Sequence, residues 1–599
     1  MLKRSPVCRF AATALLALAA TGATAAPTPG PTGLSFYDPV ASASGNHGEL
    51  VWYRSATTDL GPDAPAVTAW NVVYRSNDAL DNANLVTGTV MVPSAPWSGG
   101  GERPVINYAV GTHGLAQRCA PSLQIANGSD YEAANLAAAL SAGYAVLVSD
   151  NPGYTTGDTP TYLAGKAQGQ AVLDLFTAAT QIPDAGISAA APSAIWGYSQ
   201  GGQTAAFAGE LLSSYAPDMN VVAVAAGGTP ADFIDTAYYL NGSTGASFLL
   251  QAVVGLAEQY PDGIPLDELV NEDGKREIAN VTADQCVFDT LFPYMNKDIA
   301  EYTQGNQGLP ELLAIDSVNN TLRAQQLGTR KMPVPMYMYH GQADEFIPLA
   351  QHTALKRDYC RRYSNVTFDV YPSEHIVTQF QAAPYVLQWL GDRFAGKGTW
   401  GTCLTFNPKP TSTANPGGGN FVVSLDQWPL DARIDLATLD QTVTLPGDSS
   451  FTADTDMTAG TLDGTLEVPD FSTKLKILVN LDVGLSVVPV GRTSGTVSLD
   501  NQGQLAIDGL AQADITVRNA GFSFLRIPFG CRTSSPVDFP VNFAGPVSSL
   551  GNGKLTFAGT TTFPSLTDCG LFNSLFTTLM SGPGQEYSFT VAPPAPRRW

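Results

Sequence analysis

Short runs of continuous apolar residues alternate with helix-like segments over the longer N-terminal part of the chain. The apolar runs lie at 105–110, 145–148, 194–196, 221–225 and 334–339. The helix-like segments lie at 130–142, 163–180 and 202–215. Buried strands that alternate with helices predict right-handed β–α–β units around a mostly parallel sheet. We therefore predict an α/β domain, preceded by a hairpin-like pattern at 66–74 and 85–92.

A long insertion interrupts this alternation. Between the runs at 221–225 and 334–339 lie about 100 residues with helical patterns and no strand-like run, which is too long for an ordinary connection. The segment 248–257 within it is apolar on nearly every face. We predict a helical cap at about 230–328 above the sheet.

The pattern changes after a Pro- and Gly-rich stretch at 406–420, which is typical of a linker. Short runs of alternating polar and apolar residues follow, with a hairpin turn at 501–503 and one helix-like run at 571–580. This predicts a separate, sandwich-like all-β domain at 421–595. We call it the β module.

The N-terminus has the pattern of a secretory signal peptide. Three basic residues precede or border an apolar stretch at 10–20, and the small residues at 23–25 offer a cleavage site, so we predict removal of 1–25. A membrane span needs about 20 apolar residues, so we expect no transmembrane segment. The mature protein is predicted to be secreted, either extracellular or periplasmic.

Composition and charge narrow the function. The chain has 44% hydrophobic and 14% charged residues, a globular composition. Its formal charge of −22 would repel a phosphate backbone, so we expect no nucleic-acid partner. No CxxC or HxxxH spacing occurs and the chain has 5 His, so we expect no metal and no cofactor.

The cysteines agree with export. The six that follow the signal peptide are an even number, which in an exported chain predicts disulfides. They are Cys119, Cys286, Cys360, Cys403, Cys531 and Cys569. Cys531 and Cys569 lie alone in the β module, so we expect them to pair with each other. Spacing leaves the pairing of the other four open.

The segment Gly197-Tyr-Ser199-Gln-Gly201 stands between an apolar run and a helix-like segment. This G-x-S-x-G pattern places a serine on a sharp strand-to-helix turn, where neighbours without a Cβ let the backbone pack closely. The helix that follows directs the positive end of its dipole toward a developing oxyanion. Ser199 is therefore the predicted nucleophile.

A serine hydroxyl needs a base and an acid that orients the base. In this type of fold the order is Ser, acid, His, which leaves His340, His352 and His375. We choose His375, because it lies in a loop after a strand-like run, where a catalytic histidine is expected.

For the acid we choose Asp344, which lies just past a buried strand, where such a sheet presents its functional groups. Glu345 is the nearest rival. Asp369 is another, but it lies within a strand and is interpreted as a solvated position on the pleat.

The oxyanion hole requires two preorganised N–H donors. We expect one from the backbone of Gln200, the residue after the nucleophile. For the second we choose Thr112, in the Gly-rich loop that follows the run at 105–110. His113 in the same loop could instead contact the leaving group.

Together these motifs resemble the secretory lipase family of α/β-hydrolases, the lipase A type, over about residues 35–405. The stretches that carry the resemblance are 107–122, 149–154, 162–165 and the surroundings of Ser199, Asp344 and His375. The resemblance implies an α/β-hydrolase fold with an inserted helical cap, the three catalytic roles assigned above, and activity on acyl esters. It also implies the disulfides Cys119–Cys286 and Cys360–Cys403.

One departure concerns the oxyanion loop. Relatives often carry His-Gly-Thr-Thr-Gly there, whereas this chain has Val110 for the first His and His113 for the second Thr. The β module lies outside the resemblance.

The leading hypothesis is a secreted serine hydrolase that cleaves carboxylic esters of fatty acids through an acyl-enzyme on Ser199. The apolar segment 248–257 favours long acyl chains, because it could line a tunnel or form a lid. The alternatives are an exported serine peptidase and a surface-binding protein with an inert hydrolase-like domain. The β module offers a surface for contact with a polymer, although tryptophans are few in it.

Overall fold

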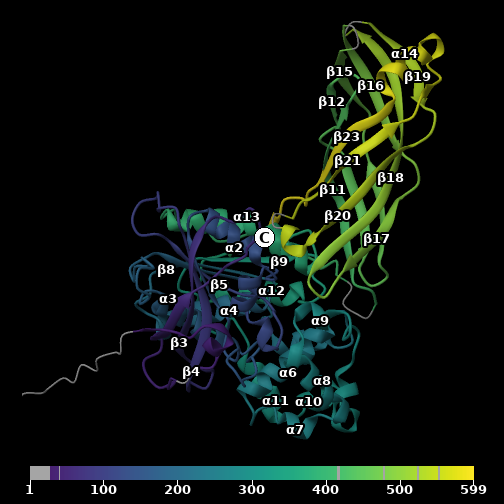
Figure 1. Cartoon of the computed structure of the whole chain (residues 1–599). Coiled ribbons are helices and arrows are strands. Elements are labelled where there is room, and N and C mark those ends of the chain that lie inside the picture. Colours follow the sequence, from purple (N-terminus) through teal and green to yellow (C-terminus); the bar gives the residue numbers. More distant parts are fainter. Residues whose placement is uncertain (1–26, 40, 415–418, 477–478, 523–524, 551–552) are drawn as a thin grey trace, which may run out of the picture.

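The protein is described by a computed structural model, which covers residues 27–39, 41–414, 419–476, 479–522, 525–550 and 553–599. The predicted signal peptide at 1–25 lies outside the described residues. Two large sheets organise the chain, one in the N-terminal part and one in an elongated C-terminal part (Figure 1).

The N-terminal sheet has 11 strands among the described residues, in the order β1-β2-β3-β4-β6-β5-β7-β8-β9-β10-β24. Strands β5 to β10 run parallel, whereas β2, β3 and β4 form antiparallel hairpins at one side. The bounds are β1 Thr28–Pro29, β2 Leu50–Ser55, β3 Val67–Asn77, β4 Ala83–Pro93, β5 Val105–Ala109, β6 Ala145–Ser149, β7 Ser193–Tyr198, β8 Val221–Gly227, β9 Met336–Gly341, β10 Val366–Tyr371 and β24 Arg597–Arg598. The predicted α/β fold is confirmed.

Helices cover both faces of this sheet (Figure 1). One face packs against α1 Pro121–Asn127, α2 Ala133–Ser141 and α13 His375–Phe394. The other face packs against α3 Gly165–Ala179, α4 Gln200–Tyr215 and α12 Leu349–Arg361. Strands buried on both faces explain why their sequences are continuous apolar runs rather than alternating ones.

The insertion between β8 and β9 is helical, as expected. Its helices are α5 Phe233–Leu240, α6 Ala246–Gln259, α7 Leu266–Leu269, α8 Glu272–Asp284, α9 Val287–Leu291, α10 Leu309–Leu313 and α11 Asp316–Ala324. They form a cap that shares two apolar clusters with neighbouring parts of the chain, and α6 contributes to both.

The β module is a single antiparallel sheet of 13 strands among the described residues. The bounds are β11 Val422–Leu436, β12 Gln441–Thr444, β13 Ser450–Asp456, β14 Thr461–Glu467, β15 Phe471–Lys476, β16 Asn480–Pro489, β17 Thr493–Leu499, β18 Gln504–Phe522, β19 Leu525–Thr533, β20 Val537–Pro546, β21 Leu555–Phe563, β22 Leu566–Thr567 and β23 Gly582–Val591. Helix α14, Asn573–Met580, lies at the far end (Figure 1). The predicted all-β C-terminal part is confirmed.

This sheet curls back on itself, so that strands from its opposite sides meet. Strand β20 lies beside β21, and the Thr561 hydroxyl donates to the Asp538 carbonyl at 2.6 Å. At the other end β12 lies beside β15, where the Gln441 side chain bonds the Lys476 backbone. Side chains alternate along β11, with apolar residues inside and polar residues outside. The curled sheet therefore encloses an apolar interior.

The last residues return to the N-terminal sheet, which the sequence pattern did not predict. Strand β24 pairs antiparallel with β10, and the carbonyl of Trp599 accepts from Lys356 Nζ at 2.8 Å. Arg598 donates two hydrogen bonds to Asp369, at 2.8 and 2.9 Å. The interpretation of Asp369 as a solvated position was wrong, because the C-terminal strand covers it and leaves it buried.

All six predicted cysteines form disulfides. The pairs are Cys119–Cys286, Cys360–Cys403 and Cys531–Cys569. In the described part of the chain, none of the helices combines the length and apolar character that a membrane span requires.

The pairing of Arg598 with Asp369 is testable through stability. Arg598→Ala would leave the buried Asp369 carboxylate with only the Tyr337 hydroxyl as a donor. Because the arginine is largely exposed, we expect a loss of about 1–2 kcal/mol in the free energy of unfolding, measured by denaturant titration. Lys409→Ala, at an exposed linker position, is the control. Equal midpoints for the two variants would contradict the proposed role of this pair.

Candidate active site

Ser199 occupies a strained turn between β7 and α4. Its φ of 59° and ψ of −122° place a residue with a side chain in the left-handed half of conformational space, which costs about 1–3 kcal/mol. The turn is held by tight backbone packing. A Cβ on Gly201 would lie 2.0 Å from the Ala109 carbonyl oxygen, and one on Gly202 would lie 2.2 Å from that of Gly227. Glycine is therefore required at both positions.

The same packing places the oxyanion loop. Ala109 ends β5, and the loop begins at Val110, whose carbonyl oxygen would lie 2.8 Å from a Cβ on Gly201. Thr112 follows two residues later and is buried. Neither its N–H nor that of Gln200 donates a hydrogen bond within the described residues, so both remain free to bind an oxyanion.

Asp344 and His375 form a hydrogen-bonded pair. Asp344 follows the end of β9, and His375 begins α13 after β10. The imidazole Nδ1 donates to Asp344 Oδ2 at 2.7 Å, so that Nε2 faces away from the carboxylate. The other oxygen, Oδ1, accepts the backbone N–H groups of Phe346 and Ile347 at 3.1 and 2.8 Å. These bonds fix the carboxylate that orients the base.

Burial by itself would raise the pKa of Asp344. The neighbouring His375 and His340, together with the hydrogen bonds to Asp344, outweigh burial and hold its pKa below the ordinary value. Asp344 is thus kept ionised, as an acid that stabilises an imidazolium must be.

Ser199 and His375 are linked through the intervening Tyr198. The Tyr198 hydroxyl donates to the His375 carbonyl at 2.7 Å, and the two ring centroids are 4.9 Å apart. The described residues include no hydrogen bond between the Ser199 hydroxyl and the imidazole. In enzymes without substrate this contact is often long and shortens when substrate binds.

The other candidate histidines lie behind the acid. His340 is buried, its Nε2 donates to the Ile347 carbonyl at 3.0 Å, and its Nδ1 lies 2.7 Å from Nδ1 of His352. Burial lowers the pKa of both rings and favours their neutral forms. Nε2 of His340 also lies 3.3 Å from Asp344 Oδ2, and neither ring is hydrogen-bonded to Ser199 in the described part of the chain.

Two buried glutamates flank the acid and the base. Glu345, the rival candidate, accepts the backbone N–H of His375 at 3.2 Å. Glu374 caps α13 by accepting the N–H groups of Ile376 and Val377. Burial is the main cause that raises the pKa of both, for Glu374 to about 7, and their mutual repulsion adds to this for Glu345. Sequence reasoning gave Glu374 no role, because only folding brings it beside Glu345.

The oxyanion loop rests on a second group of buried carboxyls. Glu132 accepts the Gly111 N–H at 2.8 Å, and Asp130 lies 3.3 Å from Nε2 of His113. His113 Nδ1 lies 3.0 Å from the Gly111 carbonyl. His113 is therefore enclosed within its own loop rather than directed at a leaving group. The Thr112 hydroxyl bonds that of Tyr162 at 2.7 Å.

Burial and neighbouring charges shift the pKa values of Glu132 and His113. Burial raises the pKa of Glu132 to about 7, against the opposing charge of His113. For His113 burial acts in the opposite direction, but the charges of Asp130 and Glu132 raise its pKa to about 9. The loop that presents Thr112 is thus held by buried groups whose pKa values depend on one another.

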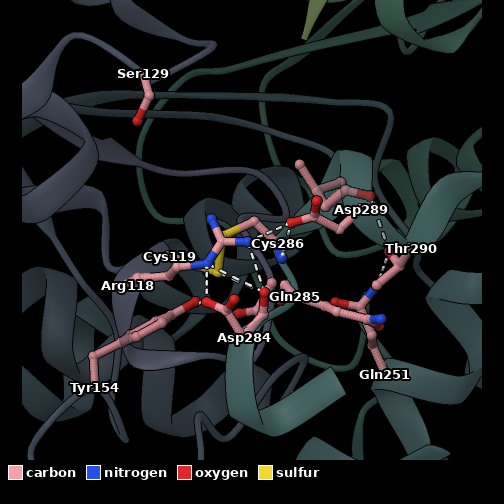
Figure 2. Close-up of a disulfide and its surroundings, with 12 residues drawn as sticks. Arg118, Cys119, Ser129, Tyr154, Gln251, Asp284, Gln285, Cys286, Asp289 and Thr290 are labelled. Carbon is pink, nitrogen blue, oxygen red and sulfur yellow. Dashed lines mark hydrogen bonds and ion pairs between the residues drawn. A yellow bond between two sulfur atoms is a disulfide. The ribbon is translucent and has the colours of Figure 1, made fainter. Parts of the chain in front are cut away.

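A disulfide joins this loop to the cap. Figure 2 shows Cys119–Cys286, with Arg118 reaching Asp284 and Asp289 beside it. The Val287 N–H donates to the His113 carbonyl at 3.0 Å. The cap is therefore covalently tied to the segment that carries the candidate oxyanion donor.

A serine on a strained strand-to-helix turn, with an acid and a histidine after later strands of the same parallel sheet, defines an α/β-hydrolase. The sequence model of the secretory lipase family matches residues 122–402. The chain belongs to this secretory lipase family. The β module lies outside the matched residues, as the resemblance in the sequence indicated.

Three similar proteins illustrate the relationship. "Probable inactive lipase MT1628" of Mycobacterium tuberculosis is 31% identical over 57% of this chain and 78% of its own length. "Secreted triacylglycerol lipase LIP7" of Malassezia globosa is 27% identical over 62% and 80%. The solved structure of Candida antarctica lipase A has a TM-score of 0.53 at 24% identity, covering 62% of this chain and 86% of that chain, which is a likeness of fold.

The titration of Glu132 yields a prediction for stability. The folded chain holds this proton up to about pH 7, whereas the unfolded carboxyl, with its ordinary pKa of 4.5, releases it earlier. Ionisation thus opposes folding as pH rises from about 4.5 to 7. Glu132→Gln should remove this loss. The unfolding free energy of the variant minus that of the parent should therefore be up to about 3 kcal/mol larger at pH 8 than at pH 4. Denaturant titrations at several pH values measure it.

Asp267→Asn, at an exposed cap position, is the control and should run parallel to the parent at every pH. A Glu132→Gln curve that also stays parallel to the parent would contradict the raised pKa.

Proposed function

We propose that the chain is a secreted serine hydrolase that cleaves carboxylic esters, with long-chain fatty-acyl esters as its substrates. The observation that carries the proposal is the Asp344–His375 hydrogen bond beside the strained turn at Ser199. Secretion is supported by the signal-peptide pattern. The names of the family and of the Malassezia relative also describe secreted proteins. Residues 35–405 are the proposed catalytic domain, and residues 421–595 are a separate module.

In the first half of the reaction, His375 Nε2 takes the proton of the Ser199 hydroxyl as Oγ attacks the ester carbonyl. The negative charge passes to the carbonyl oxygen, which accepts the N–H groups of Gln200 and Thr112. When the C–O bond breaks, the imidazolium returns its proton to the leaving alcohol. The acyl group remains on Ser199.

In the second half, His375 removes a proton from water, and the hydroxide attacks the acyl carbon. The second tetrahedral oxyanion occupies the same two donors. Its collapse breaks the bond to Oγ, which takes the proton back from His375, and the carboxylic acid leaves. Asp344 remains ionised throughout and stabilises the imidazolium in both halves.

The cap supports a long acyl chain as the substrate. A cavity of about 110 Å³ lies within it, and α6 contributes Leu250, Val253 and Leu256 to the lining. Leu163 lines the same cavity and follows Tyr162, which bonds Thr112 in the oxyanion loop. An apolar pocket in the cap favours esters of fatty acids over peptides, which are the alternative substrates of the same triad.

One relative is named as an inactive lipase. The alternative for this chain is a surface-binding protein with an inert hydrolase-like domain. This chain retains a serine, an acid and a histidine in the arrangement described above. Retention of all three groups favours an active enzyme.

The nucleophile and base are tested by substitution. Ser199→Ala and His375→Ala should each lower kcat on p-nitrophenyl esters by about 10⁶-fold, because each removes a group on which both halves of the reaction depend. His47→Ala is a matched control, since His47 bonds Asp174 on α3, outside the site. Unchanged turnover for Ser199→Ala, with the protein folded, would refute the mechanism.

The acyl pocket is tested on the cap. Leu250→Trp fills the apolar cavity and should lower kcat/KM for p-nitrophenyl palmitate by about tenfold or more, with little effect on the butyrate. Glu258→Trp, at an exposed position of the same helix, should leave both unchanged. Equal losses on both esters, or none, would show that this cavity does not hold the acyl chain.

A further inference from the structure

The interior of the β module contains a second apolar cavity, separate from the one in the cap. Its volume is about 150 Å³, and its lining is almost entirely apolar. Cavities of this size with apolar walls exclude water and admit apolar guests. Several lining side chains are only partly buried although they face inward, among them Phe451, Leu499 and Leu555. Inward-facing side chains that keep exposed surface indicate space rather than a closed core.

The cavity is long and narrow. Val423 and Ile434 both line it and stand on the same strand, β11. At about 3.3 Å per residue they lie about 35 Å apart along the strand. A volume of about 150 Å³ spread over such a length matches a thin, extended guest.

One polar group in the lining lacks a partner. The Trp428 side chain is buried in the wall, and no acceptor in the described residues lies within hydrogen-bond distance of its indole N–H. A buried donor without a partner costs about 1–3 kcal/mol. A guest that brings an oxygen acceptor would remove this cost.

The end of the cavity nearest the hydrolase adjoins the candidate active site. Ile376 and Val377, the two residues after His375, belong to its lining. Phe421 also lines it, and its ring lies 5.8 Å from that of Phe346, which stands edge-on to the His375 ring at 5.3 Å. The first turn of α13 therefore carries the candidate base and, at the next two positions, the floor of the cavity.

We propose that the interior of the β module is a binding site for one extended long-chain fatty-acyl group, whose carboxyl or ester oxygen accepts the Trp428 N–H. The apolar wall, the narrow length and the unpaired indole N–H of Trp428 match a chain with one polar end. The link to turnover rests on the proposed function, whereas the binding does not. The acyl group could belong to a released fatty acid or to an uncleaved ester, and the two share the same chemistry.

The test compares two alanines on β18 in the full-length protein. Ala511 lines the cavity between the two apolar clusters of the module, whereas Ala506 faces solvent on the same strand. The probe is parinaric acid, a fluorescent long-chain fatty acid excited in its own absorption band, so that an added tryptophan does not contribute. Thermal unfolding of both variants checks that each is folded.

Ala511→Trp should weaken parinaric acid binding by at least about tenfold, and Ala506→Trp should leave it unchanged. Trp428→Phe keeps an aromatic ring in the wall but removes the N–H donor, and should weaken binding by about tenfold. The Trp428→Phe variant still tests the proposal if Ala511→Trp does not fold. Binding that is equal in the parent, Ala506→Trp and both cavity variants would overturn the proposal and would place any bound fatty acid elsewhere, as in the cap.

Kinetics of Ala511→Trp separate the two sources of the acyl group. A fall in kcat/KM for p-nitrophenyl palmitate, with butyrate unchanged, identifies the ligand as an ester on its way to Ser199. Unchanged kcat/KM on both esters, with fatty acid binding lost, identifies it as the released acid. If the parent protein does not hydrolyse esters but still binds parinaric acid in the module, the proposed function is refuted and the proposed binding site stands.

Discussion

The structure of the site depends on close backbone packing at the turn that carries Ser199. Gly201 meets the end of β5, and Gly202 meets the end of β8, at separations that a Cβ cannot occupy. This packing sustains a strained φ at Ser199 and sets the oxyanion loop beside the first turn of α4. The candidate nucleophile and the candidate oxyanion donors are thus positioned by backbone, which is stiffer than side-chain contacts. A larger residue at either glycine would displace both together.

Around this rigid turn, the polar part of the site is built from carboxyls in an apolar setting. Burial favours the protonated forms of Glu132, Glu345 and Glu374, whereas Asp344 is kept ionised by His375 and His340. Asp344 therefore carries the negative charge that stabilises an imidazolium. The protonated glutamates add no negative charge of their own. The same arrangement makes the oxyanion loop sensitive to pH, because Glu132, which accepts the Gly111 N–H, has a pKa of about 7.

The apolar parts of the molecule meet at α13. The cap holds one cavity, the β module holds another, and the helix that begins at His375 lies beside the second. The C-terminal strand passes back to the N-terminal sheet and closes over Asp369, so the module is anchored to the hydrolase at both of its ends. The β module is therefore not only attached to the hydrolase part, because its interior adjoins the candidate base.

The local sequence determined the main secondary-structure elements and pointed to the candidate chemistry. Continuous apolar runs predicted the buried parallel strands, and G-x-S-x-G between a strand and a helix predicted the turn at Ser199, because periodicity and steric demand are local properties. The scarcity of histidine narrowed the base to three candidates. Contacts between distant segments were decided only by folding, including the curl of the β module, the return of Arg598 to Asp369, and the enclosure of His113 by Asp130. No short window of sequence contains both partners of such a contact, and the burial that shifts their proton affinities exists only once the chain has closed around them.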